Sequence, residues 1–173
     1  MFKSIIKGKV FKVEDDIDTH QIYPGRYLYL TSSQEMAVHA MEDIIPNFYK
    51  KIEGEDWIIV GGKNFGCGSS REHASRALLC AGIKAIVAES FGRIFYRNAI
   101  NIGLPVLKCS DIIKEVNQSD CIKINLQDGL IFLYDPERKI SIEKYPPQLL
   151  SILKSGGLIS YLKKYREYCH LNG

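Results

Sequence analysis

The sequence predicts an α/β fold with a mixed parallel and antiparallel sheet and flanking helices. Between residues 57 and 107, three short apolar runs alternate with two stretches of helical spacing, which is the pattern of a βαβαβ unit. Between residues 121 and 142, three alternating runs follow, the first two around the turn Gln127-Asp128-Gly129, and these predict antiparallel strands. With 173 residues, 46% of them hydrophobic, the chain can bury one sizeable core, so we expect a single domain over residues 1–173.

The N-terminal part is expected to form a strand, a loop and a helix. Residues 4–13 alternate loosely and are rich in β-branched side chains, as in a strand, whereas the acidic stretch 14–25 ends in proline and glycine, as in a loop. The helix should run from residue 32 or 33 to a point before Pro46, because the residue that precedes a proline is disfavoured in a helix.

The remaining elements are bounded mainly by glycines and prolines. Gly82 and Gly103 follow two helical stretches and can adopt the left-handed conformation that ends a helix, and Gly156-Gly157 separates the last two helices. The parallel strands should be joined by right-handed crossovers. The expected strands are 57–60, 84–88, 104–107, 121–126, 130–134 and 138–142, and the expected helices are 72–81, 91–102, 147–154 and 158–168.

Charge and hydropathy argue against nucleic-acid and membrane proteins. The net charge is +3, but the lysines are spread along the chain and form no run, so nucleic acid is an unlikely partner. No apolar run approaches the roughly 20 residues that span a bilayer. The first seven residues are too short and too interrupted by lysine to be the core of a signal sequence, so we expect no membrane association.

The cysteines indicate a reducing, cytoplasmic location. Their number is odd and no C-x-x-C spacing occurs, which argues against a disulfide framework and against a self-contained zinc or iron–sulfur site. We therefore expect no metal site built by this chain alone. The five are Cys67, Cys80, Cys109, Cys121 and Cys169.

A glycine-rich segment over residues 61–73 (GGKNFGCGSSREH) is the strongest candidate site. It places four glycines in eight residues, which permits positive φ angles and a close approach of the backbone to a ligand. A helix that begins near Ser70 would direct unpaired N–H groups and a partial positive charge at the same place. The segment therefore favours an anion, and Arg71 is suited to bind a carboxylate through both guanidinium nitrogens.

Several simpler interpretations of this segment stay open. Ser69-x-x-Glu72 is by itself a capping box, Cys67 can be a small loop residue, and Arg71 can be a solvated residue in the first helical turn. His73 is expected to pack or to orient its neighbours. The glycines match neither the P-loop pattern nor G-x-G-x-x-G, and no G-x-S-x-G elbow is present, so nucleotide binding and serine hydrolysis are disfavoured.

Two arginines further along the chain admit two interpretations. Arg93 and Arg97 are separated by four residues, so they share one face of the helix expected over residues 91–102. That face is either hydrated or an interface with another chain, which would use the same residue types.

Residues 64–74 (NFGCGSSREHA) and 90–105 (SFGRIFYRNAINIGLP) resemble the small subunits of 3-isopropylmalate dehydratase, in the aconitase superfamily. The similarity extends through residues 18–30 and 156–162. It implies a swivelling β/β/α domain that closes over a 4Fe-4S cluster held by a separate large subunit, in a heterodimer or heterotetramer. It also implies a hydro-lyase of leucine biosynthesis that acts on a small hydroxy dicarboxylate.

The resemblance assigns roles to the glycine-rich segment. Ser69 corresponds to the base that removes a proton from the carbon next to a carboxylate, and backbone groups of Gly66, Cys67 and Gly68 would support its alkoxide. Ser70 and Arg71, together with Gly68, would hold the substrate carboxylate. Three more residues are expected around this site without a defined role, namely His20, Asn64 and His73.

Substrate choice is associated in this family with the loop over residues 22–30. Tyr29 stands where relatives that act on tricarboxylates, such as homoaconitate, carry arginine, so an alkyl substituent is expected here. His20 replaces an aspartate that is usual in the family, which can alter local charge. Alternatives are a related alkylmalate hydro-lyase acting on dimethylmalate, methylmalate or citraconate, then homoaconitase, and finally an RNA-binding or regulatory module.

Overall fold

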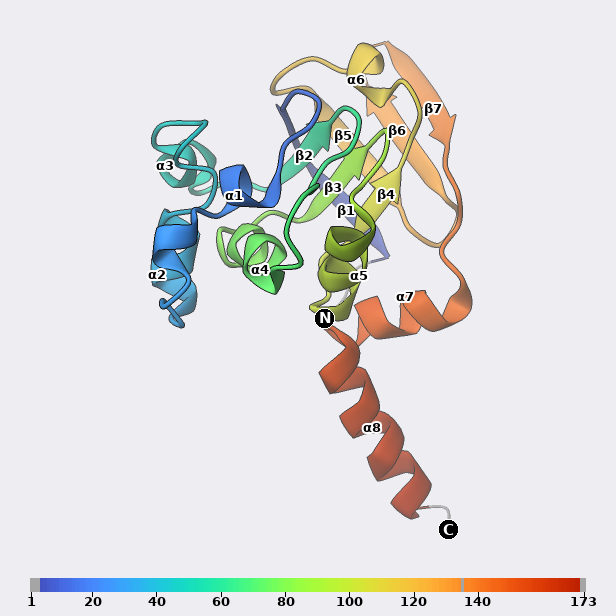
Figure 1. Cartoon of the computed structure of the whole chain (residues 1–173). Helices are drawn as coiled ribbons and strands as arrows, with labels where there is room; N and C mark the ends of the chain where they lie inside the picture. The colour runs from blue at the N-terminus through green and yellow to red at the C-terminus, as the bar shows by residue number, and fades with distance from the viewer. Residues whose placement is uncertain (1–3, 135, 172–173) are drawn as a thin grey trace.

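A computed structural model describes residues 4–134 and 136–171, with side chains up to residue 166. Residues 1–3 and the side chain of Cys169, on which two of the expectations above depend, lie outside this part. A seven-stranded sheet forms the centre of the molecule (Figure 1). Its strands are β1 Ile5–Lys12, β2 Trp57–Gly61, β3 Ala85–Ala88, β4 Val106–Lys108, β5 Cys121–Asn125, β6 Leu130–Tyr134 and β7 Glu137–Ser141.

The sheet has a parallel and an antiparallel half that meet at β1. The strand order is β4-β3-β2-β1-β5-β6-β7. β1 pairs in parallel with β2, in the register Lys9 to Trp57, and antiparallel with β5, in the register Lys7 to Lys123. The mixed sheet predicted from the sequence is therefore confirmed.

Helices connect and flank these strands. The helices of the βαβαβ unit lie on one side of the parallel strands, because both crossovers step along the sheet in the same direction (Figure 1). The helices are α1 Thr19–Ile22, α2 Ser33–Val38, α3 Phe48–Ile52, α4 Glu72–Cys80, α5 Arg93–Asn101, α6 Ile112–Glu115, α7 Pro147–Lys154 and α8 Leu158–Leu171, and a 3-10 turn, η1, covers Gly25–Tyr27. Among the described residues, no helix is long and apolar enough to cross a membrane.

The helix ends follow the glycine pattern. Gly82 and Gly103 have φ angles of +97° and +87°, which is the left-handed conformation expected just beyond α4 and α5. Gly103 also allows a close backbone contact, because a Cβ atom there would lie 2.8 Å from the carbonyl carbon of Gly156. This contact attaches the turn between α7 and α8 to the end of α5, and from there α8 projects away from the body (Figure 1).

The helix expected from residue 32 or 33 to a point before Pro46 is wrong in its length. α2 ends at Val38, and turns follow up to residue 44. The reason lies in a long-range contact: the Met41 N–H donates to the carbonyl of Ile22 at 2.8 Å, and Met41 has a φ of 54°. A residue in this conformation cannot continue a right-handed helix.

A short helix lies where a loop was expected. Asp18 caps α1 by accepting from the backbone N–H groups of His20 and Gln21 at 2.7 and 2.8 Å. The Gln21 side chain in turn accepts from the Asp18 N–H at 2.8 Å, which completes a capping box. α1 therefore has a fixed start beside the glycine-rich loop.

The core lies against the sheet and includes the single tryptophan. Trp57, 8% exposed, packs edge-on against Phe11 with ring centroids 5.8 Å apart, and Phe11 packs in the same way on Phe48 of α3 at 5.0 Å. The Trp57 indole N–H is buried without a hydrogen-bond partner. Burial of these rings is what holds α3 on the sheet.

Candidate active site

The glycine-rich loop, residues 62–71, leaves β2 at its carboxyl end and leads into α4. Ligand sites of open α/β sheets commonly lie at this edge. Backbone hydrogen bonds join the loop to the segment before α1: Gly66 N–H donates to the Ile17 carbonyl at 2.7 Å, and Thr19 N–H donates to the Cys67 carbonyl at 2.9 Å. Two segments about 50 residues apart in the chain thus form one hydrogen-bonded unit.

Gly66 is required by its position over α5. Its φ is +74°, and a Cβ atom there would lie 2.2 Å from Cγ of the buried Phe95. Phe65 is buried on the same ring, with centroids 5.4 Å apart. Gly92, at the start of α5, would carry a Cβ atom only 2.5 Å from the Gly66 carbonyl oxygen. The loop is therefore packed on α5 through two glycines.

Asn64 serves the architecture of the loop. It adopts a φ of 58°, its side-chain amide donates to Asp16 at 2.9 Å, and its backbone N–H donates to the Ser90 hydroxyl at 2.8 Å. Asparagine tolerates the left-handed conformation better than most residues. The structure thus gives Asn64 a defined role as a link between the loop, the segment before α1 and the turn after β3.

Ser69 is held at the surface of this unit by Thr19. Its backbone N–H donates to the Thr19 hydroxyl at 3.1 Å, and Thr19 is only 1% exposed. Ser69 itself is half-buried, and Ser70 beside it is exposed. The Ser69 residue is therefore fixed through its main chain while the loop stays open to a ligand or to another chain.

The capping box predicted from Ser69-x-x-Glu72 is wrong. α4 begins at Glu72, its N-cap residue is Arg71, and no side chain caps it. The start of the helix at residue 72 agrees with the expected range 72–81, but Ser69 lies too far before it to act as its cap. Arg71 lies just before the helix instead of in its first turn.

The structure narrows the set of backbone donors expected near Ser69. The N–H groups of Gly66 and Cys67 already donate to the carbonyls of Ile17 and Asn64, at 2.7 and 3.3 Å, so these two groups are engaged within the loop. Gly68, with a φ of +91°, is exposed, and its N–H has no partner among the described residues. Of the three predicted supporting residues, only Gly68 keeps a donor for a ligand.

Arg71 meets His20 and Gly25 beside Ser70. Its guanidinium nitrogen Nη1 lies 3.4 Å from Nδ1 of His20, and a Cβ atom on Gly25 would lie 3.1 Å from the same nitrogen. The structure thus brings together Arg71 and the residue that replaces the family's aspartate. The absence of a side chain at Gly25 leaves space for the guanidinium.

The remaining predicted residues lie around this centre. Ser70 accepts through its carbonyl a hydrogen bond from the Asn98 side chain at 3.3 Å, which links α5 to the loop. His73 is half-buried and stacks on Tyr23, with centroids 6.3 Å apart. Tyr29 is 76% exposed. It has no hydrogen-bond partner among the described residues, and its loop contacts the site through Gly25, beside Arg71, and through Tyr23, which stacks on His73.

Cys67 is poorly suited to nucleophilic chemistry. Burial, with the carboxylates of Asp18 and Asp16, raises the pKa of its thiol. A thiol whose pKa is raised stays protonated near neutral pH, and the thiolate is the reactive form. The groups of the loop that remain candidates for chemistry are therefore the Ser69 and Ser70 hydroxyls, the Arg71 guanidinium and the Gly68 N–H.

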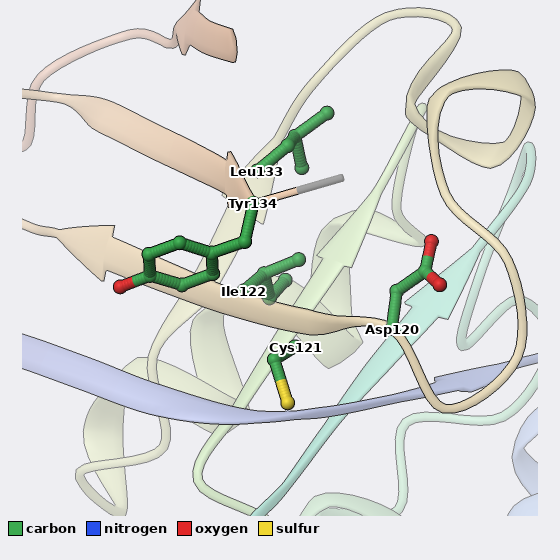
Figure 2. A pocket seen from close by; sticks show the side chains of 5 residues that line it. All are labelled: Asp120, Cys121, Ile122, Leu133 and Tyr134. Carbon is green, nitrogen blue, oxygen red and sulfur yellow. The ribbon is translucent and has the colours of Figure 1, made fainter. Parts of the chain in front are cut away.

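The described residues form no metal site around Ser69 and Arg71, and a pocket in the antiparallel half of the sheet lies elsewhere. Within residues 4–134 and 136–166, no three histidine, cysteine or acidic side chains are grouped so that they could hold a metal ion. Figure 2 shows a small pocket on β5 and β6, and none of its lining residues belongs to the glycine-rich loop. They are Asp120, Cys121, Ile122, Leu133 and Tyr134.

Comparison with known proteins agrees with this geometry. The family of aconitase C-terminal domains matches residues 5–111. The 3-isopropylmalate dehydratase small subunit of Halothermothrix orenii is 49% identical over 160 residues, which cover 91% of this chain and 95% of that protein. The chain belongs to the isopropylmalate dehydratase small-subunit family. Another of these small subunits, the isopropylmalate/citramalate isomerase small subunit of Methanocaldococcus jannaschii, is also 49% identical, over 94% of this chain and 96% of that one.

A solved member of the family has the same fold. The crystal structure of 3-isopropylmalate dehydratase from Methanocaldococcus jannaschii superposes with a TM-score of 0.90 and 43% identity, and covers 98% of this small subunit and 99% of that chain. The β/β/α architecture implied by the resemblance is therefore confirmed.

Sequence reasoning assigned no role to three residues that build this small-subunit site. Thr19 accepts from Ser69, Ser90 accepts from Asn64, and Asn98 donates to Ser70. The one local signal was Asp18-x-x-Gln21, a capping-box pattern that fixes the start of α1 and so the place of Thr19.

Proposed function

We propose that the chain is the small subunit of 3-isopropylmalate dehydratase, which interconverts 2-isopropylmalate and 3-isopropylmalate by dehydration and rehydration in leucine biosynthesis. The observation that carries the proposal is Ser69, fixed by the buried Thr19 hydroxyl on an open loop beside Arg71. Relatives at 49% identity over more than 90% of the chain support the same activity. The active enzyme is a complex of this chain with a large subunit.

Ser69 is the proton acceptor in this proposal. In the dehydration direction its alkoxide takes the proton from the carbon next to a substrate carboxylate, and in rehydration its hydroxyl returns a proton. A serine is a poor base, so its charge needs donors that are already in place. The Gly68 N–H is available for this purpose, because no described group accepts from it.

Arg71 and Ser70 bind the substrate carboxylate. Arg71 is half-buried and no carboxylate among the described residues pairs with its guanidinium, so it can offer two parallel N–H donors to a substrate carboxylate. The Ser70 hydroxyl is exposed beside it. A 4Fe-4S cluster carried by the large subunit supplies Lewis-acid activation of the substrate hydroxyl.

The Tyr29 loop favours an alkyl substituent over a third carboxylate. Tyr29 offers an aromatic surface where a tricarboxylate would need a cation. A methyl group in place of isopropyl is the second candidate, because one relative at 49% identity is named isopropylmalate/citramalate isomerase small subunit. Turnover of a panel of alkyl malates by the complex ranks these substrates.

The decisive experiment replaces Ser69 with alanine in the complex. The small subunit is co-expressed with a cluster-bearing large subunit under anaerobic conditions, and alkene formation from isopropylmalate is followed by absorbance. Ser69→Ala is expected to lower kcat at least about 1000-fold while the subunits still co-elute. Ser141→Ala, at an exposed position of β7, is the control. Normal turnover by Ser69→Ala removes this residue from the base role.

Assembly and location are part of the proposal. The complex is a heterodimer or heterotetramer, which light scattering on the co-purified subunits decides. A cytoplasmic location fits the free thiols of Cys67, Cys80, Cys109 and Cys121.

A further inference from the structure

Arg26 links the Tyr29 loop to a distant segment of the chain. It lies in η1, three residues before Tyr29, and its guanidinium forks onto Asp43: Nη1 donates to Oδ2 at 2.9 Å and Nη2 donates to Oδ1 at 2.5 Å. Nη2 also donates to Glu42 at 2.6 Å. A fork of this kind fixes orientation as well as distance.

Aromatic contacts close this link into a ring of four side chains. The Tyr27 ring stacks on His39, with centroids 3.7 Å apart and planes 13° from parallel. The Arg26 guanidinium lies over the Tyr27 ring, 4.7 Å from its centroid. His39 Nδ1 lies 2.7 Å from a carboxylate oxygen of Glu42. Each member therefore touches two others, and Glu42 joins the arginine to the histidine.

The network adds to a small number of other contacts that hold this segment, namely the Tyr23 hydroxyl, which donates to the Tyr27 carbonyl at 3.0 Å, and the packing of Tyr27, Leu28 and Leu30 on the core. η1 is one turn of 3-10 helix, and such turns have poor intrinsic stability. Two backbone hydrogen bonds connect η1 to the residues that follow it: the Leu28 N–H donates to the Gly25 carbonyl at 3.3 Å, and the Leu30 N–H donates to the Tyr27 carbonyl at 3.0 Å. Tyr29 lies between these two donors, so its place follows from that of η1.

The ion pairs are too exposed to matter much for the overall stability. The Arg26 side chain is 53% exposed and that of Asp43 is 42% exposed, and pairs of this kind are screened by solvent. Their effect is local, because they restrict a loop whose tip makes no hydrogen bond among the described residues.

We propose that Arg26 is a positioning residue for substrate selectivity: through Asp43, Glu42 and the Tyr27–His39 stack, it fixes where Tyr29 meets the alkyl group of the substrate. This inference rests on the proposed function. It assigns no contact between Arg26 and the substrate, since both terminal nitrogens of its guanidinium already donate to carboxylates.

Arg26→Gln in the complex tests the proposal through the ratio of kcat/KM for isopropylmalate to that for citramalate. The ratio is expected to fall by about five- to ten-fold, mainly through KM for isopropylmalate, because the base is untouched. Asp43→Asn should produce a similar fall, and the double variant should be no worse than either single one. Arg26→Lys keeps the charge without the fork and should restore only part of the ratio. Arg138→Gln is the matched control, because it breaks an Arg–Glu pair with Glu115 at 2.7 Å in the antiparallel half.

Two further measurements make the result decisive. In a Tyr29→Ala background, Arg26→Gln should change the ratio no further, and an additive change would mean that Arg26 acts on the substrate by itself. Hydrogen exchange of the free small subunit should be faster over residues 24–30 in Arg26→Gln than in wild type. Unchanged exchange, or an unchanged ratio, overturns the inference. If the wild-type complex does not turn over isopropylmalate, the proposed function fails, while hydrogen exchange still tests the network.

Discussion

At the scale of single residues, the candidate site depends on one buried hydroxyl. Thr19 is 1% exposed and accepts from the Ser69 N–H, and its own N–H donates to the Cys67 carbonyl. It thus links α1 to the glycine-rich loop at two points. Without the hydroxyl, Ser69 keeps its hydroxymethyl group and loses the bond that fixes its main chain.

Thr19→Val removes that hydroxyl at nearly constant shape. We expect the free energy of unfolding to fall by about 1–2 kcal/mol, since a half-buried N–H loses its acceptor, and kcat of the complex to fall with little change in KM. Urea unfolding and steady-state kinetics measure the two effects. Thr19→Ser keeps the acceptor and should stay close to wild type, and equal kcat for all three proteins would contradict the role given to Thr19.

Gly66 permits a test of the packing of the loop on α5. An alanine there meets two obstacles, a φ of +74° and the Phe95 ring at 2.2 Å, so Gly66→Ala should lower the free energy of unfolding by about 2–4 kcal/mol. Gly54 has a similar φ of +81° with no atom within 4 Å of a new Cβ, so Gly54→Ala should lower it by only about 1 kcal/mol. Denaturant midpoints at constant slope give both values, and equal losses would rule out the Phe95 contact as the cause.

The residues of the site were predictable only in part. Ser69 and Arg71 belong to one local pattern of glycines, hydroxyls and charge, so the sequence alone could single them out as candidates. Thr19 could not be identified in this way, because its partner lies 50 residues away and the pairing exists only in the folded chain. The expectation for Gly66 and Cys67 was incomplete for the same reason, since their N–H groups turn out to be engaged.

At the scale of secondary-structure elements, short segments of the N-terminal third are held by side chains more than by regular hydrogen bonding. The Asp18–Gln21 capping box fixes α1, and the Arg26 network fixes η1 against residues 39–43. Although burial alone would raise the pKa of Glu42, hydrogen bonds from His39, Tyr27 and Arg26 outweigh it and lower that pKa. The carboxylate form is therefore favoured by the fold.

This shift predicts an acid-sensitive contribution to stability. Because the pKa of Glu42 is lower in the folded chain, its stabilisation is complete above the ordinary glutamate value and is lost as the pH falls through the folded value. Between neutral pH and about pH 4, the free energy of unfolding of Glu42→Gln should therefore fall less steeply than that of wild type. Glu53→Gln, at an exposed position outside the network, should keep the wild-type slope. Identical slopes for Glu42→Gln and wild type would refute the assignment.

Most elements were predictable because their signals are local. The strands over residues 57–60 and 84–88 and the glycines after α4 and α5 needed only periodicity and conformational preference. α1 carried a local signal too, in Asp18-x-x-Gln21. The end of α2 did not, since it depends on the Met41 N–H reaching the Ile22 carbonyl across the fold.

At the scale of the whole molecule, β1 is the strand that unites the two halves of the sheet. Its alternation predicted a strand, but its place between β2 and β5 depends on partners far along the chain. The periphery is attached differently, through the contact of backbone with backbone at the α7–α8 turn. A Cβ atom on Gly157 would lie 2.6 Å from the Asn101 carbonyl oxygen, so α5 and α8 approach as closely as their main chains allow.

Gly157→Ala is expected to loosen α8 from the body. The new methyl group must push the turn away from α5, so amide hydrogens of α8 should exchange at least about ten-fold faster, while those of β1–β3 change little. Gly156→Ala also has a positive φ, of 79°, but no atom lies within 4 Å of its Cβ position, which makes it the matched control. Hydrogen exchange read by mass spectrometry compares the two. Equal protection of α8 in both would show that the contact does not hold the helix.

Trp57 gives this protein a built-in optical reporter. It is the single indole of the chain, it packs on Phe11, and it begins β2, whereas the glycine-rich loop leaves that strand at its other end, about 13 Å away. Its fluorescence therefore reports whether the core under α3 is folded, and it should not change when a ligand binds at the Ser69 loop. Spectroscopists can thus read denaturation from this emission in the presence of substrate, without a correction for binding.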